Sequence, residues 1–221
     1  MGQEKEKLYL HNVLFMGVAH IIGLVGLVGA VSGHWKIQTI ILGAILFCVS
    51  GLGITVGYHR YFTHRSFTCG KVLQVVFAIS GTTAVQNSIK KWVRDHVVHH
   101  QATDTEGDPY NASRGFWHSH IGWIIFKDPD RKKEEDYRAI DYLMKDPWTA
   151  QLVHFQHKHY YVLATFFSGV VPVLVASLWG DPLGGLVFAG FSRLLIVWHM
   201  TFCINSLAKA DRLEHTLGGS T

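Results

Sequence analysis

Four long apolar stretches constrain the fold of this chain more than any other feature of its sequence. The 221 residues are 48% hydrophobic, and the apolar side chains gather in blocks that run from Val13 to Val31, Ile37 to Gly57, Tyr160 to Trp179 and Leu186 to Ala208. A helix crosses a hydrocarbon core about 30 Å thick with about 20 apolar residues. We therefore predict an all-α integral membrane protein with four transmembrane helices.

One apolar segment is too short to cross a membrane, and two of the predicted spans contain a proline or an arginine. Val72 to Val85 has only 14 residues, so we expect it to be buried or interfacial rather than to cross the membrane. Pro172 is expected to kink the third span without ending it. The fourth span carries Arg193 and His199, and polar groups at such depth face protein or a cavity. For both residues we favour structural pairing over catalysis.

Basic residues near the ends of the spans predict the orientation of the chain. Lys36 alone lies on the opposite short turns, whereas five basic residues flank the central segment: Arg60, Arg65, Lys71, Lys145 and Lys158. Short loops rich in Lys and Arg stay in the cytosol. We therefore expect the central segment and both termini to be cytosolic. The sequon that begins at Asn111 would then face away from the glycosylation machinery and remain unused.

Histidines are concentrated in this central segment. The chain has 15 histidines beside 16 acidic residues, and His96, His99 and His100 follow the spacing i, i+3 and i+4. On a helix these positions share one face, which aims the imidazoles in similar directions. Neutral imidazoles in fixed directions are good metal ligands. The alternative is a polar, solvated helix face that is rich in histidine.

A second histidine pair favours the metal interpretation. His59 and His64 directly follow the second apolar block. The three cysteines have no paired spacing, so they indicate neither a disulfide framework nor a thiolate zinc site: Cys48, Cys69 and Cys203. Five histidines without a cysteine partner favour a nitrogen-rich site for a borderline metal such as iron or zinc.

The distribution of charge argues against one class of partner. The formal net charge is +4, and no basic stripe is interleaved with aromatic residues, so nucleic acid is not expected as a partner. The charged run from Asp128 to Asp136 is expected to be solvated surface without a chemical role.

Two histidine boxes, His59-Arg-Tyr-Phe-Thr-His64 and His96-Val-Val-His-His100, resemble those of the acyl-CoA Δ9 desaturases, the stearoyl-CoA desaturases. The resemblance extends from about Gly51 to Ala208. Other segments that resemble the family are Gln86-Asn-Ser88, Trp92-Val-Arg-Asp95, Asp104 to Asn111, Arg114-Gly-Phe116 and Asn205-Ser-Leu-Ala208.

The resemblance implies a fold and a reaction. The implied protein lies in the endoplasmic reticulum membrane, with a cytosolic histidine-rich helical cap that holds two irons above an acyl tunnel. It would use O2 to insert a cis double bond at the Δ9 position of a saturated acyl-CoA, in unsaturated fatty acid biosynthesis. Electrons would come from NADH through cytochrome b5. An unactivated methylene offers no acid or leaving group, so such a reaction needs a metal-based oxidant that the protein ligates and orients.

The resemblance also implies site residues, by match to the family's motifs. The implied iron ligands are His59, His64, His96, His99 and His100. Asn205 is implied to hold a metal-bound water. The implied substrate contacts are Asn87, Arg94 and Asp95 for the CoA part and Trp92 beside the substrate. From the residues alone, Arg94 and Asp95 fit an ion pair on the helix surface equally well.

The chain departs from the family after Ala208. The family continues there with a ligand histidine and a third histidine box, whereas here Lys209 follows and the sequence stops at Thr221. Removing Lys209 to Glu214 would join Ala208 to His215-Thr-Leu-Gly218, which resembles the family's continuation. We therefore interpret residues 1–208 as an incomplete desaturase domain and 209–221 as an atypical tail, with His215 as a displaced iron ligand.

Two other functions stay open at this point. Membrane lipid hydroxylases use related histidine boxes, although the segment from Asp104 to Asn111 resembles the desaturases. A non-catalytic membrane protein that binds acyl-CoA, or associates with a full-length desaturase, is favoured by the missing ligands. On that ground we expect the chain as given not to desaturate acyl-CoA. Two irons per chain would indicate an enzyme, and none would indicate a binding or structural role.

Overall fold

Four helices within the described residues are long and apolar enough to cross a membrane: Leu10–Val31, Ile37–Thr63, Tyr160–Ser177 and Pro182–Leu207. The computed structural model describes residues 7–127 and 136–217, and side chains as far as Leu207. The predicted all-α class and the four spans are confirmed. One boundary differs clearly, because the second span continues past the predicted end at Gly57 to Thr63.

The first two spans are α1 (Leu10–Val31) and α2 (Ile37–Leu52), and α2 continues into η1 (Gly53–Thr63), which is π-helical. The third span comprises α7 (Tyr160–Thr165), η5 (Phe166–Val170) and α8 (Val171–Ser177). Pro172 lies in the first turn of α8, where its missing N–H removes no hydrogen bond from that helix. The fourth span comprises α9 (Pro182–Gly184), η6 (Gly185–Ser192) and α10 (Arg193–Leu217).

The fourth span is the central one. In its most apolar window 56% of the residues are buried, against 22% to 28% in the other three spans. Ser192 donates a hydrogen bond of 2.7 Å to the carbonyl of Gly23 in α1. Arg193 is buried and donates to the hydroxyl of Ser50 at 2.9 Å and to the carbonyl of Thr83. The predicted structural pairing of Arg193 is therefore confirmed.

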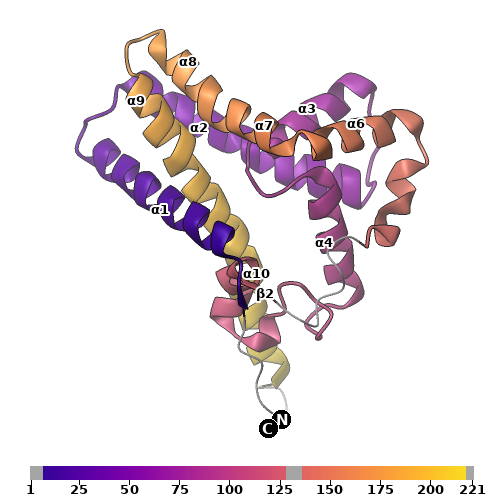
Figure 1. Ribbon diagram of the computed structural model, residues 1–221. Coiled ribbons are helices and arrows are strands. Elements are labelled where there is room, and N and C mark those ends of the chain that lie inside the picture. Colours follow the sequence, from indigo (N-terminus) through magenta and orange to yellow (C-terminus); the bar gives the residue numbers. More distant parts are fainter. Residues whose placement is uncertain (1–6, 128–135, 218–221) are drawn as a thin grey trace.

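The segment between the second and third spans folds into short helices. In chain order these are α3 (Lys71–Thr82), α4 (Ile89–Gln101), η2 (Ala112–Arg114), η3 (His118–Gly122), α5 (Trp123–Ile125), η4 (Arg138–Met144) and α6 (Pro147–Lys158). Helices α3, α4 and α6 gather at one side of the molecule (Figure 1). They share a buried cluster with η1 that includes Tyr58, Val93 and Val153. The end of the second span therefore packs directly against α4.

Local sequence sets the starts of two of these helices. Ser88 precedes α4, and its hydroxyl accepts a hydrogen bond from the backbone N–H of Lys91 at 3.4 Å. Asp146 caps α6 in the same way through the N–H of Thr149 at 2.9 Å. Such caps satisfy N–H groups that have no partner within the helix.

Of the two segments predicted to lie at a surface or interface, the structure describes one. The predicted buried or interfacial segment is α3, whose Val72 and Val76 are exposed while Gln74 and Ala78 are buried. The charged run from Asp128 lies outside the described residues as far as position 135. Within the described residues, the exception to the all-helical fold is β1 (Lys7–Leu8), which pairs antiparallel with β2 (Phe126–Lys127).

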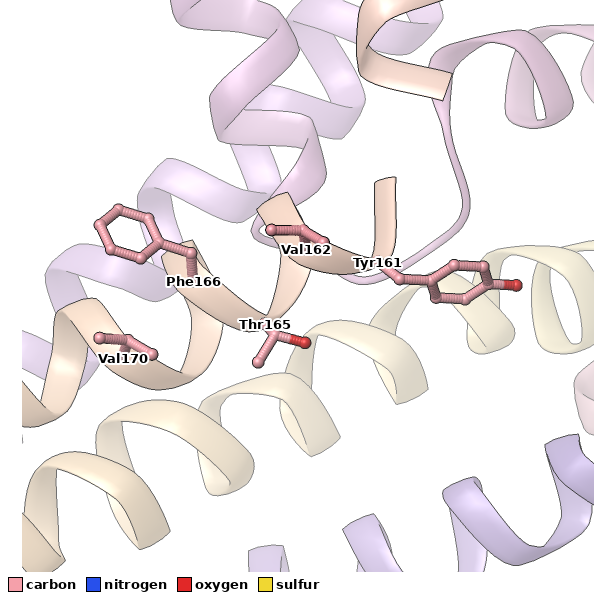
Figure 2. Close-up of a pocket in the computed structure, with 5 residues that line it drawn as sticks. All are labelled: Tyr161, Val162, Thr165, Phe166 and Val170. Carbon is pink, nitrogen blue, oxygen red and sulfur yellow. The ribbon is translucent and has the colours of Figure 1, made fainter. Parts of the chain in front are cut away.

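A shallow apolar groove lies along the third span. Tyr161, Val162, Thr165, Phe166 and Val170 line it (Figure 2). Four of these side chains are exposed although they are large and apolar, which is the pattern of a lipid-facing helix surface: Tyr161, Val162, Phe166 and Val170. None of the five belongs to the predicted site, so we assign this groove to contact with lipid.

Candidate metal centre

Four of the predicted ligand histidines come together where the second span meets α4. His59 lies in η1 and His64 directly follows it, while His96 and His100 lie in α4. One ring nitrogen from each lies within 4.8 Å of the others. The Nε2 atoms of His59 and His64 are 3.1 Å apart, and those of His96 and His100 are 3.0 Å apart. Such convergence of ring nitrogens is what a metal ion requires.

The π-helical geometry of η1 explains how His59 and His64 meet. Five residues along an α-helix correspond to about 500°, which would leave the two side chains about 140° apart. In a π-helix the backbone bond joins residues i and i+5, so these positions stack above each other. The N–H of His64 donates to the carbonyl of His59 at 3.0 Å, and the two rings lie 4.5 Å apart. Sequence periodicity alone did not reveal this segment.

Three of the four histidines lie outside the spans. Of these three, His96 is half-buried, whereas His64 and His100 are exposed. Its ring stacks on Trp92 at 4.9 Å with an interplanar angle of 26°, and its Nδ1 lies 3.1 Å from the hydroxyl of Tyr110. Burial, followed by repulsion from His59 and His100, lowers the pKa of His96 to about 2. The ring is therefore neutral at physiological pH and keeps a lone pair for a metal.

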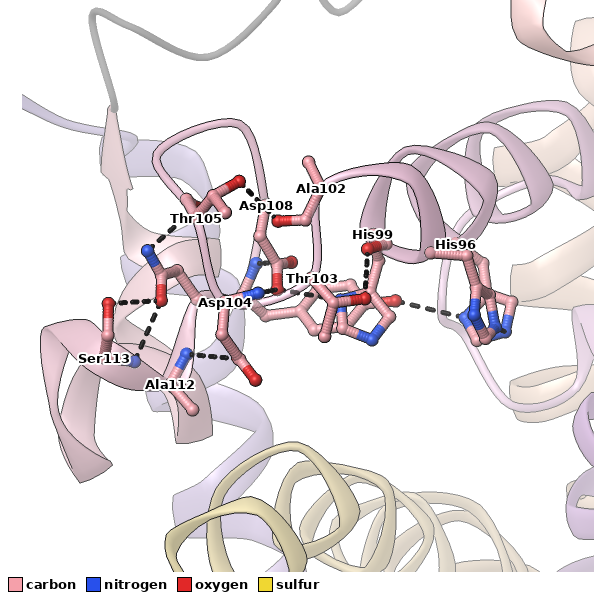
Figure 3. A network of polar contacts seen from close by, with 12 residues as sticks. His96, His99, Ala102, Thr103, Asp104, Thr105, Asp108, Ala112 and Ser113 are labelled. Carbon is pink, nitrogen blue, oxygen red and sulfur yellow. Dashed lines mark hydrogen bonds and ion pairs between the residues drawn. The ribbon is translucent and has the colours of Figure 1, made fainter. Parts of the chain in front are cut away.

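His99 lies beside the four-histidine cluster and not within it. Its ring is 5.5 Å from that of His100 and 6.0 Å from that of His96. Nδ1 of His99 lies 2.8 Å from a carboxylate oxygen of Asp108 (Figure 3). Because a carboxylate accepts, Nδ1–H of His99 donates to Asp108, and in the neutral ring Nε2 is then the nitrogen with a lone pair. Carboxylates hold metal-binding imidazoles in this way.

The loop after α4 holds Asp108 in place. The N–H of Asp104 donates to one oxygen of Asp108 at 2.9 Å, and the N–H of Tyr110 donates to the other at 3.1 Å. Figure 3 shows this network between the end of α4 and η2. The role of Asp108 was missed from the sequence, although its position in the acidic segment after the second histidine box was visible.

The predicted substrate residues have different environments. Arg94 is only 2% exposed and forms an ion pair with Asp95, so the ion pair of the alternative is present, but it is buried and does not lie on the helix surface. Asn87 is exposed, has a φ of 75°, and donates its backbone N–H to the hydroxyl of Tyr160 at 2.9 Å. Trp92 packs on His96 as described. Three of these residues lie in the first half of α4 and Asn87 lies just before it, and among the four it is Trp92 whose ring contacts the cluster.

Of the two predicted site residues on α10, the structure describes the side chain of Asn205 but not that of His215. Asn205 is half-buried. The backbone of α10 remains helical through Lys209 to Glu214 and as far as Leu217, but the side chain of His215 lies outside the described part of the structure. A second polar contact was missed from the sequence: the side-chain N–H of Gln86 donates to the hydroxyl of Thr201 at 2.9 Å.

Comparisons with known proteins place this histidine arrangement in a family. A protein of Schizosaccharomyces pombe named "Probable acyl-CoA desaturase" is 40% identical over 202 residues, which cover 90% of this chain and 40% of that protein. Acyl-CoA desaturase 1 of Saccharomyces cerevisiae is 39% identical over 201 residues, covering 90% of this chain and 38% of the relative. The chain belongs to the acyl-CoA desaturase family. No family model matches it.

The length of the relatives and the double-bond position in one relative's name concern the predicted activity. This chain spans well under two thirds of the length of both yeast relatives. An acyl-CoA Δ11 desaturase of Choristoneura rosaceana is 36% identical over 222 residues, covering 97% of this chain and 61% of that protein. The predicted family is confirmed. Similarity to a protein named for the Δ11 position leaves the predicted Δ9 position to the proposal that follows.

Proposed function

We propose that this chain is the membrane and histidine-bearing part of an acyl-CoA desaturase that inserts a cis double bond into a saturated fatty acyl-CoA. The observation that carries the proposal is the convergence of His59, His64, His96 and His100 at the end of an apolar span. A reactive metal at this boundary would lie next to the acyl chain of a lipid-like substrate. We further propose the Δ9 position, with O2 as the oxidant and cytochrome b5 as the electron donor.

The residues fit iron as the metal. Imidazole nitrogens suit iron and zinc, and the cluster contains no thiolate that would favour zinc. Bound iron would supply the oxidising strength that removal of hydrogen from an unactivated methylene requires. We propose that His59, His64, His96 and His100 hold iron directly. We propose that His99 adds Nε2, aimed by Asp108, and that Asn205 holds a metal-bound water.

The residues around α4 are proposed to bind the substrate. Trp92 presents a flat apolar face beside His96 and would position the acyl chain next to the metals. Asn87, Arg94 and Asp95 are proposed to hold the CoA part. Because Arg94 is buried against Asp95, we propose that it acts by fixing the carboxylate of Asp95 and not by binding a phosphate directly.

The location and the domain organisation are part of the same proposal. We propose the endoplasmic reticulum membrane, with the histidine cluster and both termini in the cytosol, on the support of the basic residues at the span ends. We also propose that residues 1–208 form the desaturase domain and that Lys209 to Glu214 displace His215. Six helical residues rotate a side chain by about 240° and move it by about 9 Å. Deleting these six residues should therefore increase the iron bound per chain.

The decisive experiment measures metal and product together. The chain is purified in detergent, and iron per chain is determined by mass spectrometry for the original chain and for His96→Ala and His100→Ala. His34→Ala is the matched control, because His34 is exposed on a turn distant in sequence from the cluster. We expect both α4 variants to lose iron and the control to keep it.

Activity is tested in a cell that lacks its own desaturase. We expect no monounsaturated fatty acids from the chain as given. A chain without Lys209 to Glu214, extended by a third histidine box, should make them, and loss of this product in His100→Ala but not in His34→Ala would support the proposal. Binding of acyl-CoA with no iron in any preparation would instead support a non-catalytic acyl-CoA-binding protein. The position of a double bond in the product, read by mass spectrometry, would test the Δ9 assignment.

A further inference from the structure

Three other histidines form a line between α1, α10 and η3. Nε2 of His20 lies 3.1 Å from Nε2 of His199. The opposite nitrogen of His199, Nδ1, lies 3.1 Å from Nε2 of His120. Because the two neighbours contact opposite sides of the His199 ring, no more than two nitrogens converge at any point. The geometry is therefore unlike that of the metal centre.

Both ends of the line are closed by backbone carbonyls. Nδ1 of His20 lies 2.6 Å from the carbonyl of Met16. Nδ1 of His120 lies 2.9 Å from the hydroxyl of Ser206, which in turn contacts the carbonyl of Phe202 at 2.9 Å. All six ring nitrogens of the three histidines therefore have a partner, and the line contains five polar contacts in series.

When all groups are neutral, the line has one proton fewer than it has polar contacts. Each of the three imidazoles carries one N–H and Ser206 carries one O–H, which gives four protons for five contacts. A carbonyl can only accept, so the contact without a proton can move along the line but cannot be removed. One added proton fills all five contacts. The charge can then reside on any of the three rings.

We propose that His20, His199 and His120 form a proton relay that takes up a single proton and passes it between α1 and Ser206. A proton that arrives on one ring nitrogen is matched by release from the opposite N–H of the same ring. His199 thereby returns to the neutral state with its tautomer reversed, while His20 keeps its Nδ1–H on the carbonyl of Met16. No electron transfer and no co-reactant are needed, and the relay operates whether or not a metal is bound.

The surroundings suit such a relay. His120 is buried, and burial lowers its pKa, so this ring is neutral when the line holds no added proton. Apolar groups enclose the line: Trp198 lies against His20, and Phe202 lies against both His120 and His199. Among the described side chains of α1, α10 and η3, no carboxylate or basic group other than these histidines is hydrogen-bonded to the three rings. The added charge is therefore shared within the line.

The relay has a use if the proposed function holds. Removal of two hydrogens from a methylene pair with one O2, two electrons and two protons yields the double bond and two waters. Each turnover therefore consumes two protons. Ser206, at one end of the line, directly follows Asn205 in α10. This link to desaturation rests on the proposed function, whereas proton binding by the line does not.

The test is a titration of the full chain, labelled with 15N in its histidine rings and followed by nuclear magnetic resonance in detergent micelles. His199→Gln is the central variant, because an amide can hydrogen-bond to both neighbours but cannot exchange its tautomer. His34→Gln is the matched control. We expect the rings of His20 and His120 to change together on uptake of one proton in the original chain and the control, and to titrate separately in His199→Gln.

Identical titration of His20 and His120 in the original chain and in His199→Gln would overturn the proposal, as would uptake of more than one proton by the three rings. If His199→Gln fails to fold, His120→Gln interrupts the line between His199 and Ser206 but leaves the contact of His20 with His199. The rings of His20 and His199 should then still change together, and separate titration of these two rings would overturn the proposal. Iron content is measured in every sample. Unchanged iron with altered titration separates this proposal from that of the metal centre.

Discussion

Gly53→Ala tests whether the close approach of two backbones positions the metal centre. Gly53 begins η1, the segment that carries His59. A Cβ atom at this position would lie 2.3 Å from the backbone nitrogen of Gly81 and 2.3 Å from the carbonyl carbon of Ser80, both in α3. Ordinary contacts of a Cβ atom begin near 3.4 Å. Helix α3 must therefore move away from η1 by about 1 Å, the difference between these distances.

The size of the effect follows from this displacement. Overpacking of a well-packed interior costs about 1 to 3 kcal/mol, and in proteins of this size each kcal/mol lowers the unfolding midpoint by about 2 to 4 °C. We expect Gly53→Ala to lower the midpoint by about 2 to 12 °C. It should also reduce the iron bound per chain, because η1 moves relative to α4. Tryptophan fluorescence during heating in one detergent, together with metal analysis, measures both quantities.

Gly51→Ala is the matched control for this substitution. Gly51 lies two residues earlier in the same helix, and a Cβ atom there meets nothing within 4 Å. Alanine is favoured over glycine inside a helix by about 1 kcal/mol, so the control should keep or raise the midpoint. A Gly53→Ala chain as stable as Gly51→Ala, with the same iron content, would refute the reasoning. The contact between η1 and α3 would then be adjustable and would not determine the geometry of the centre.

Three further predictions concern the segment between the second and third spans. Asn111 should carry no glycan in cells, because it is buried and its side-chain N–H donates to the carbonyl of Thr105 at 2.8 Å; an endoglycosidase-sensitive shift in mass would contradict this. Ser88→Ala should destabilise the protein by about 1 kcal/mol through loss of the cap of α4, measured as a lower unfolding midpoint beside Ser66→Ala. Arg94→Ala should cost about 3 to 5 kcal/mol, because it removes one member of a buried ion pair, and Arg94→Lys should recover part of that loss.

The membrane fold could be predicted from the sequence because it depends on the length of apolar blocks. The error at the second span has a physical cause. His59 and Arg60 lower the local hydropathy, so the apolar pattern ends near Gly57, yet the backbone continues as a π-helix to Thr63. Hydropathy reports which environment side chains prefer and does not report whether the hydrogen-bonded ladder continues. The pairing of His59 with His64 depends on that ladder and could not be predicted.

The histidines of α4 show a similar limit. At about 100° per residue, His99 lies about 60° to one side of His96 and His100 about 40° to the other side. The spacing predicts a shared face but does not predict which edge of that face meets η1. Contact with η1 selects His96 and His100, and Asp108 receives His99. That selection depends on tertiary packing, which a local pattern cannot contain.

The arrangement of the histidines separates two kinds of chemistry within one membrane protein. In the four-histidine cluster the ring nitrogens of different side chains point at a common volume, so protonation of one raises the cost of protonating the next and a metal ion is the favoured occupant. In the line through His199 each ring uses its two nitrogens on opposite neighbours, so there is no common volume, and the vacancy is a missing hydrogen. Convergence therefore favours a metal cation and linearity favours a proton. The same residue type gives both results because imidazole has two nitrogens, and the fold determines whether one or both of them face other histidines.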